Sequence, residues 1–261
     1  MKKHTFALCA YGDSPYLENC MRSLTAQSVK SNIILCTSTP SLYIEELAWK
    51  YGIPVYVREG ESDIQEDWNF AYEKADSELV TIAHQDDMYH RDYVKTLLNM
   101  YGRYPDMTLF TTDYVTVKER TLKRQKGLVE WVKVILRLPL RCQNSNAGTA
   151  VKKAALIFGN SICCSSCTYN KRKLGTPLFT SEFRYVLDWD TLWKLAEREG
   201  RFVCVEKPLI YYRVHDGATT KKWIGDNRRS EEELAMFSRF WPQPAVRLLE
   251  YFYKKAYGAY D

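Results

Sequence analysis

Two adjacent carboxylates, Asp86 and Asp87, follow a short apolar run in residues 79–89, which read LVTIAHQDDMY. A run rich in Val, Ile and Thr is typical of a buried strand, so we expect the two acids at its carboxyl end. In open α/β sheets, ligands bind at that edge. Neighbouring carboxylates repel each other, so they are stable either in full solvent or beside a divalent cation that is bound to phosphate oxygens. The segment alone leaves both interpretations open.

Two further clusters carry groups that could act with these acids. Asp188 and Asp190 open an apolar helical pattern, and Arg213 and His215 follow an apolar strand pattern. A divalent metal together with an Arg and a His would neutralise a diphosphate, and one further carboxylate could serve as a general base. Asp188 and Asp190 are two residues apart and point to different faces of a helix, so we expect only one of them to reach an acceptor and act as the base. This inventory suits the transfer of a sugar from a nucleotide diphosphate, because the leaving diphosphate gains charge and the acceptor hydroxyl loses a proton.

The first half of the chain alternates between strand and helix patterns, which would place these groups at a sheet edge. We expect strands at residues 5–10, 32–36, 54–57, 79–83 and 107–112, and helices from Pro15, over 42–51, from Asp63 and over 91–104. Gly52 marks a helix end, and Asp63 to Glu66 has the spacing of a capping box. Such alternation predicts a mostly parallel sheet with helices on both faces.

The second half is less regular. Residues 118–141 are basic and carry Leu128, Val129, Val132, Ile135 and Leu138 on one face of a helix that we expect to run to Pro139. This apolar face either packs on the protein core or lies on an anionic membrane surface. We also expect a helix after a loop in residues 182–198, strands at 202–206 and 209–212 separated by Lys207 and Pro208, and helices in 230–257 broken at Pro242 and Pro244.

The composition is that of an ordinary globular chain of 261 residues, with 26% charged residues and a net charge of +5. The sequence contains no run of about 18 apolar residues, so it predicts no transmembrane helix. The first expected strand begins too early in the chain to leave room for a signal peptide. We therefore expect a cytoplasmic protein with no nucleic-acid partner and with reduced cysteines.

Four motifs, in order, resemble those of family 2 glycosyltransferases over residues 6–220. CAYGDSPYLENCMRSLTAQS resembles the family's first strand and helix, and HQDD at residues 84–87 resembles its D-x-D-D metal motif. LDWDTLW at 187–193 resembles the segment with the catalytic base, and YYRVHDGATT at 211–220 resembles the R-x-H segment that closes over the diphosphate. Three positions depart from the family pattern: His84 replaces the first acid, Trp68 stands where Arg is common, and Leu187 replaces a Glu.

The resemblance implies the GT-A fold, an α/β architecture with a single Rossmann-like, mostly parallel sheet flanked by helices and a C-terminal helical extension. Residues 1–220 would form the glycosyltransferase domain, with a nucleotide-binding half at 1–113 and an acceptor-binding half at 114–220. Residues 221–261 would form the extension.

The resemblance also implies roles for single residues. Asp188 would be the catalytic base, and Mg²⁺ or Mn²⁺ would be held by Asp86, Asp87 and His215. The donor would be bound by Ala10, Tyr11, Asp13, Thr37, Asp67, Asp86 and Arg213.

The implied reaction is inverting transfer from a nucleotide-diphosphate sugar, with a UDP-sugar as the first choice, to a hydroxyl of a glycan or lipid-linked glycan in cell-surface polysaccharide synthesis. The second strand ends in Thr37-Ser38-Thr39 without the acid that many members use on the base. A lipid-linked acceptor would bring the protein to the inner face of the cell membrane. The alternative is a non-catalytic nucleotide-sugar-binding or scaffold subunit of a polysaccharide assembly.

Overall fold

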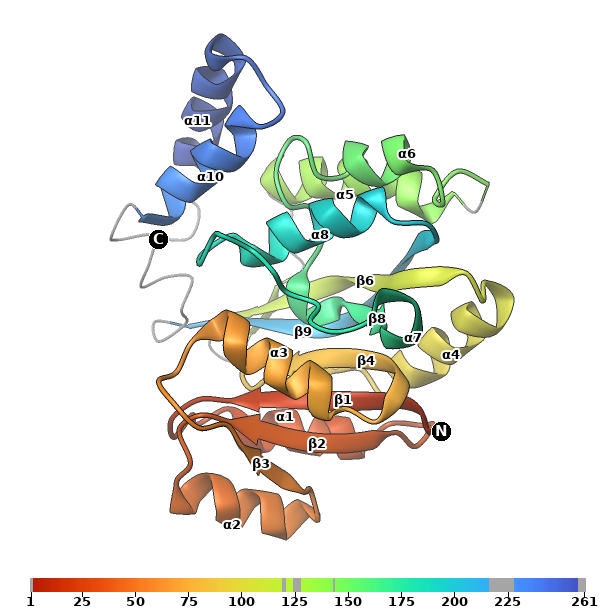
Figure 1. The fold of residues 1–261 in the computed structure, drawn as a ribbon, viewed down its shortest axis with the longest axis vertical. Coiled ribbons are helices and arrows are strands. Elements are labelled where there is room, and N and C mark those ends of the chain that lie inside the picture. Colours follow the sequence, from red (N-terminus) through yellow and green to blue (C-terminus); the bar gives the residue numbers. More distant parts are fainter. Residues whose placement is uncertain (1, 119–120, 124–127, 143, 216–227, 258–261) are drawn as a thin grey trace.

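The computed structural model describes residues 2–118, 121–123, 128–142, 144–215 and 228–257 (Figure 1). The strands are β1 (Lys2–Ala10), β2 (Asn32–Thr37), β3 (Val55–Val57), β4 (Ser77–His84), β5 (Met88–Tyr89), β6 (Met107–Lys118), β7 (Thr121–Lys123), β8 (Thr168–Asn170) and β9 (Arg201–Val214). The helices are α1 (Leu17–Thr25), α2 (Leu42–Tyr51), α3 (Ile64–Lys74), α4 (Tyr93–Arg103), α5 (Leu128–Arg141), α6 (Thr149–Ala154), α7 (Lys171–Leu174), α8 (Leu187–Glu197), α10 (Arg228–Ser238) and α11 (Gln243–Tyr257), with a 3₁₀ turn η1 (Cys164–Ser166).

The described strands form one sheet in the order β3-β2-β1-β4-β8-β6-β9-β5, and β7 pairs with β6. The first four strands of this order are all parallel, as predicted from the strand and helix alternation. β8 runs antiparallel between β4 and β6, so the second half of the sheet is mixed. Helices α1, α2 and α4 pack on one apolar cluster and α3 and α8 on another, which gives a sheet covered on both faces. The predicted α/β class is confirmed, including the C-terminal helices (Figure 1).

Local signals explain why the first half folds as it does. The Ser41 hydroxyl caps α2, and Gly52 ends this helix in the left-handed conformation at φ 62°. The Asp63 carboxylate accepts hydrogen bonds from the Gln65 and Glu66 N–H groups and opens α3. Because each helix begins and ends at a defined residue, the chain returns after each helix to form the next parallel strand.

The parallel register brings several strand ends to one edge of the sheet. Ala10 at the end of β1 pairs with Thr37 at the end of β2, and Cys9 pairs with His84 at the end of β4. Residues that directly follow β1, β2 and β4 therefore lie side by side. This is the edge where ligands bind in such sheets.

Two predictions for the second half were wrong. The strands expected at 202–206 and 209–212 form one strand, β9, whose pairing with β6 shifts where Asp113 faces Pro208. Such a bulge accommodates a proline, which cannot donate a ladder hydrogen bond. The helix expected to stop at Pro139 runs to Arg141, and Val132, Ile135 and Leu138 on its apolar face are exposed. The side chains of Leu128 and Val129 lie outside the described part.

The C-terminal helices break at Pro242, as predicted, but not at Pro244. α10 ends at Ser238 and α11 begins at Gln243, so Pro242 lies between them and Pro244 lies in the first turn of α11. A proline in a first turn removes no intrahelical hydrogen bond. None of the helices in the described ranges is long and apolar enough to cross a membrane.

Candidate active site

Asp87 lies buried just after β4. Among the described residues, one of its carboxylate oxygens has a hydrogen-bond partner and the other has none. Its Oδ1 accepts a hydrogen bond from the backbone N–H of Arg213 at 2.8 Å. Its Oδ2 is buried and forms no hydrogen bond with the described residues. Burial and the charge of Asp86 raise the pKa of Asp87 well above its usual value. A bound cation would offset this cost of ionising the carboxyl group.

Asp86 faces the end of β9. Its Oδ2 lies 3.2 Å from His215 Nε2, and its backbone carbonyl accepts a hydrogen bond from Arg213 Nε at 3.0 Å. Burial opposes ionisation of Asp86, but the hydrogen bond from His215 and the charge of His84 outweigh it, so the pKa of Asp86 is lowered. Tyr16 packs against both basic groups, with the Arg213 guanidinium 4.5 Å and the His215 ring 4.6 Å from its ring centroid. The predicted residues Asp86, Asp87, Arg213 and His215 are thus brought together.

His84 completes a group of three potential metal ligands. Ligand atoms of His84, Asp86 and Asp87 lie within 4.8 Å of one another. The His84 ring stacks on Trp68 with centroids 5.1 Å apart, and its Nε2 is buried without a hydrogen-bond partner among the described residues. Burial lowers the pKa of His84, which favours the neutral imidazole that binds metals.

These side chains fit a divalent cation, because a buried carboxylate oxygen and a buried ring nitrogen both lack partners there. His84, which the sequence pattern presented as a departure, belongs to the group of three, whereas His215 contacts Asp86 from outside it. The signal was the position of His84 in HQDD, two residues before Asp86. Whether this histidine can act as a ligand depends on the direction of its imidazole, which the sequence does not show.

The ends of β1 and β2 form the neighbouring part of the edge. Tyr11 exchanges two hydrogen bonds with the side chain of Gln85, which lies between His84 and Asp86. Thr37 is buried and accepts a hydrogen bond from the Thr39 N–H through its hydroxyl. Ala10 is buried, whereas Tyr11 is largely exposed. The predicted nucleotide contacts Ala10, Tyr11 and Thr37 therefore adjoin the acid pair.

Asp13 and Asp67, the two remaining residues predicted to bind the nucleotide-sugar donor, form contacts with other residues of the protein. Asp13 accepts a hydrogen bond from the Ser41 hydroxyl at the start of α2. Asp67 pairs with Arg58 at 2.7 Å and accepts hydrogen bonds from Ser38 and Ser62. These contacts connect the end of β2 to α3, so Asp67 stabilises the edge whether or not it touches a donor.

Asp188 lies in the first turn of α8 and is half-buried. Its Oδ2 accepts a hydrogen bond from Asn160 Nδ2 at 2.8 Å. Burial raises the pKa of Asp188, although the charges of Arg229 and His84 oppose that rise. Asp188 and His84 interact electrostatically. A carboxylate with a raised pKa is suited to general-base work.

Asp190 is fully buried and has two cationic partners. Arg239 Nη1 lies 2.7 Å from its Oδ1, and Lys194 Nζ lies 2.7 Å from its Oδ2. Asp190 therefore joins α8 to the segment after α10. The two acids differ in surroundings, as expected from their positions on different faces of one helix.

Comparison with known families fits this geometry. The family described as "Glycosyl transferase family 2" matches residues 5–174, which is more than half of the chain. The chain belongs to glycosyl transferase family 2. The matched range includes the end of β4 with Asp86 and Asp87, whereas Asp188, Arg213 and His215 lie beyond it.

Solved glycosyltransferase structures share the fold of this family 2 chain. S. aureus TarS 1–349 superposes with a TM-score of 0.61 at 14% identity, covering 91% of this chain and 72% of that one. A structure of S. aureus TarS that is not limited to these residues in its description gives a TM-score of 0.62 at 15% identity, covering 91% of this chain and 44% of that one. Glucosyl-3-phosphoglycerate synthase from Mycobacterium tuberculosis, in complex with Mn²⁺ and UDP-glucose, gives 0.59 at 14% identity, covering 91% of this chain and 79% of that one. No curated protein matches the sequence. The likeness confirms the predicted GT-A fold.

Proposed function

We propose that this protein is an inverting glycosyltransferase that moves a sugar from a nucleotide-diphosphate donor to a hydroxyl group of a glycan or lipid-linked glycan. The observation that carries the proposal is that hydrogen bonds join the acids after β4 to the basic residues at the end of β9. The acids and His84 offer a cation site, Arg213 and His215 offer positive charge, and Asp188 offers a base. Membership of the family supports the same reaction class.

A UDP-sugar is the donor that we propose. S. aureus TarS 1–349 has been solved in complex with UDP-GlcNAc, and the mycobacterial synthase with Mn²⁺ and UDP-glucose. The nucleotide would lie along Ala10, Tyr11 and Thr37, next to Gln85. Mg²⁺ or Mn²⁺ held by Asp86 and Asp87, with His84 or His215 as a further ligand, would offset the negative charge of the leaving diphosphate.

The basic residues at the end of β9 would act on the same charge. Arg213 and His215 are already aligned by Asp87, Asp86 and Tyr16, so little rearrangement is needed for them to face a diphosphate. Prearranged positive groups stabilise developing negative charge because no reorganisation is needed during the reaction.

Asp188 would take the proton from the acceptor hydroxyl. Asn160 holds its carboxylate at 2.8 Å, and burial raises its pKa, which makes the ionised form a stronger base. A single base with direct attack on the sugar carbon implies inversion of configuration. The predicted location is cytoplasmic, at the inner face of the cell membrane where the acceptor is lipid-linked.

A panel of nucleotide sugars tested with Mn²⁺ separates an enzyme from a scaffold subunit. We expect one donor to release its nucleoside diphosphate, with release slowed in Asp188→Asn. Binding of a donor without any release, in the presence of acceptor glycans, would instead assign the chain to the non-catalytic class.

A further inference from the structure

Helix α5 packs with its apolar face outward. Arg137 is 2% exposed and Leu140 is fully buried, whereas Trp131 is 61% and Ile135 58% exposed. The exposed apolar residues recur at helical spacing on one face, opposite the buried pair. They are Trp131, Val132, Ile135 and Leu138. An amphipathic helix on a protein core normally buries its apolar face and exposes its charged residues, whereas α5 exposes this apolar face and buries Arg137.

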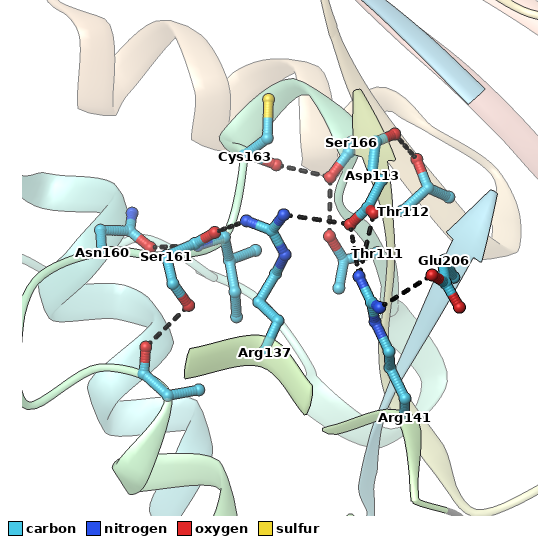
Figure 2. Close-up of polar contacts among 12 residues, drawn as sticks. Thr111, Thr112, Asp113, Arg137, Arg141, Asn160, Ser161, Cys163, Ser166 and Glu206 are labelled. Carbon is cyan, nitrogen blue, oxygen red and sulfur yellow. Dashed lines mark hydrogen bonds and ion pairs between the residues drawn. The ribbon is translucent and has the colours of Figure 1, made fainter. Parts of the chain in front are cut away.

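A buried ion-pair network holds the helix in this orientation (Figure 2). The Asp113 carboxylate accepts hydrogen bonds from Arg137 at 3.0 Å and from Arg141 at 2.9 Å and 3.0 Å. Arg141 also lies 3.5 Å from Glu206. Rotating α5 to bury its apolar face would separate Arg137 from Asp113 and leave a nearly buried carboxylate without its partner, which is strongly unfavourable. The outward direction of the apolar face therefore follows from Asp113.

The part of the sequence that leads into this helix is strongly basic. Residues 118–133 contain six basic residues and two acidic ones, a net charge of +4. An exposed apolar face with a Trp, in a part of the sequence that carries a positive net charge, matches the acyl and headgroup layers of an anionic bilayer. A second copy of the chain is a poorer occupant than an anionic bilayer, because two chains that each carry a net charge of +5 repel each other.

The same network connects α5 to the proposed base. Arg137 donates a hydrogen bond to the carbonyl of Ser161, and the preceding residue, Asn160, donates to Asp188 at 2.8 Å. Figure 2 shows Arg137 between Asp113 and Ser161. Arg137 on α5 is therefore connected through Ser161 and Asn160 to Asp188, the residue that would contact the acceptor.

We propose that α5 lays Trp131, Val132, Ile135 and Leu138 on an anionic phospholipid bilayer, and that the acceptor is lipid-linked. The docking stands on the structure of α5, and its connection to an acceptor rests on the proposed function. The bilayer would supply both the acceptor and the surface that covers the apolar face.

Vesicle flotation of the full chain tests the docking. Wild type should float with vesicles that contain phosphatidylglycerol, less with pure phosphatidylcholine vesicles, and less as salt rises. Each basic residue at the surface is expected to contribute about fivefold to affinity. Ile135→Glu should weaken vesicle binding by about tenfold or more, because it places a charge among acyl chains. Leu248→Glu on α11 is the matched control, since Leu248 is equally exposed at 58%, and should bind like wild type.

Several outcomes would overturn the docking. They are unchanged flotation of Ile135→Glu, equal binding to neutral vesicles, and binding insensitive to salt. A dimer in sedimentation velocity that Ile135→Glu dissolves would assign the face to a second copy instead.

The two proposals fail separately. Ile135→Glu should keep wild-type nucleotide release from the donor in solution, and Asp188→Asn should keep wild-type flotation. If the protein is active but does not bind vesicles, only the docking proposal is wrong. If it binds vesicles but is inactive on every donor, only the proposed function is wrong.

Discussion

The backbone N–H of Arg213 donates a hydrogen bond to Asp87 Oδ1 at 2.8 Å, and this bond joins the end of β9 to the end of β4. The Arg213 side chain adds a second bond, to the carbonyl of Asp86. The residues proposed to hold a cation and the residue proposed to meet the diphosphate are therefore one connected unit. Asp87 Oδ2 has no hydrogen-bond partner among the described residues, so it remains available to a ligand.

Asp87→Asn should remove metal-dependent donor binding without unfolding the protein. The amide oxygen can still accept the Arg213 N–H, so the fold is kept, but the charge that binds the cation is lost. We expect UDP affinity in Mn²⁺ to fall by about 100-fold or more, since even the partners of metal ligands are worth about 10–100-fold. Calorimetric titration measures this effect. Asp92→Asn, at a carboxylate paired with Ser28 outside the site, is the control, and wild-type turnover in Asp87→Asn would contradict the metal assignment.

His84→Asp should change the metal preference of the protein. An imidazole ligand favours Mn²⁺ over Mg²⁺, whereas a carboxylate is well suited to Mg²⁺. Replacing His84 restores the first acid of the family's motif, so Mg²⁺ should support UDP binding better in the variant, relative to Mn²⁺, than in wild type. The same titration with each ion provides the ratio. His90→Asp, at a histidine bonded to the Asp92 N–H, should leave the ratio unaltered; an unchanged ratio in His84→Asp would exclude His84 as a ligand.

Asp188→Asn and Asp190→Asn should fail in different ways. Asp188→Asn should lower turnover by about 10²–10⁴-fold with little change in donor affinity, which is the usual worth of a general base. Asp190→Asn should lower the free energy of unfolding by about 3 kcal/mol, because Arg239 and Lys194 lose a buried partner. Urea denaturation and turnover separate the two effects. An inactive but stable Asp190→Asn beside an active Asp188→Asn would move the base by two residues.

Much of the first half could be predicted because its signals are local. Ser41 and Gly52 bound α2, and Asp63 opens α3, each through bonds to residues at most a few positions away. The acid pair at the end of β4 follows from the apolar strand before it. Such short-range chemistry is visible in a single sequence.

The rest depends on partners that are distant in the sequence. The outward face of α5 follows from Asp113, which lies 24 residues before Arg137, and helical periodicity cannot reveal a buried carboxylate elsewhere. Likewise, the sequence pattern predicted His215 as a metal ligand and presented His84 as a departure from the family's metal motif. Only the structure shows that His215 contacts Asp86, 129 residues away, and that His84 Nε2 is buried with no hydrogen-bond partner in the described part of the chain.

The pH dependence of transfer should report the surroundings of Asp188. Its pKa is raised by burial, and the base must be ionised, so kcat/KM should fall as pH decreases through that raised pKa, above the ordinary value of about 3.9 for Asp. The hydrogen bond from Asn160 stabilises the ionised form and lowers this pKa. Asn160→Ala should therefore shift the acid limb of the kcat/KM profile to still higher pH, while Asn99→Ala, at an exposed position on α4, should leave it in place. A limb that stays unchanged in Asn160→Ala, or moves to lower pH, would show that the titrating group is not Asp188.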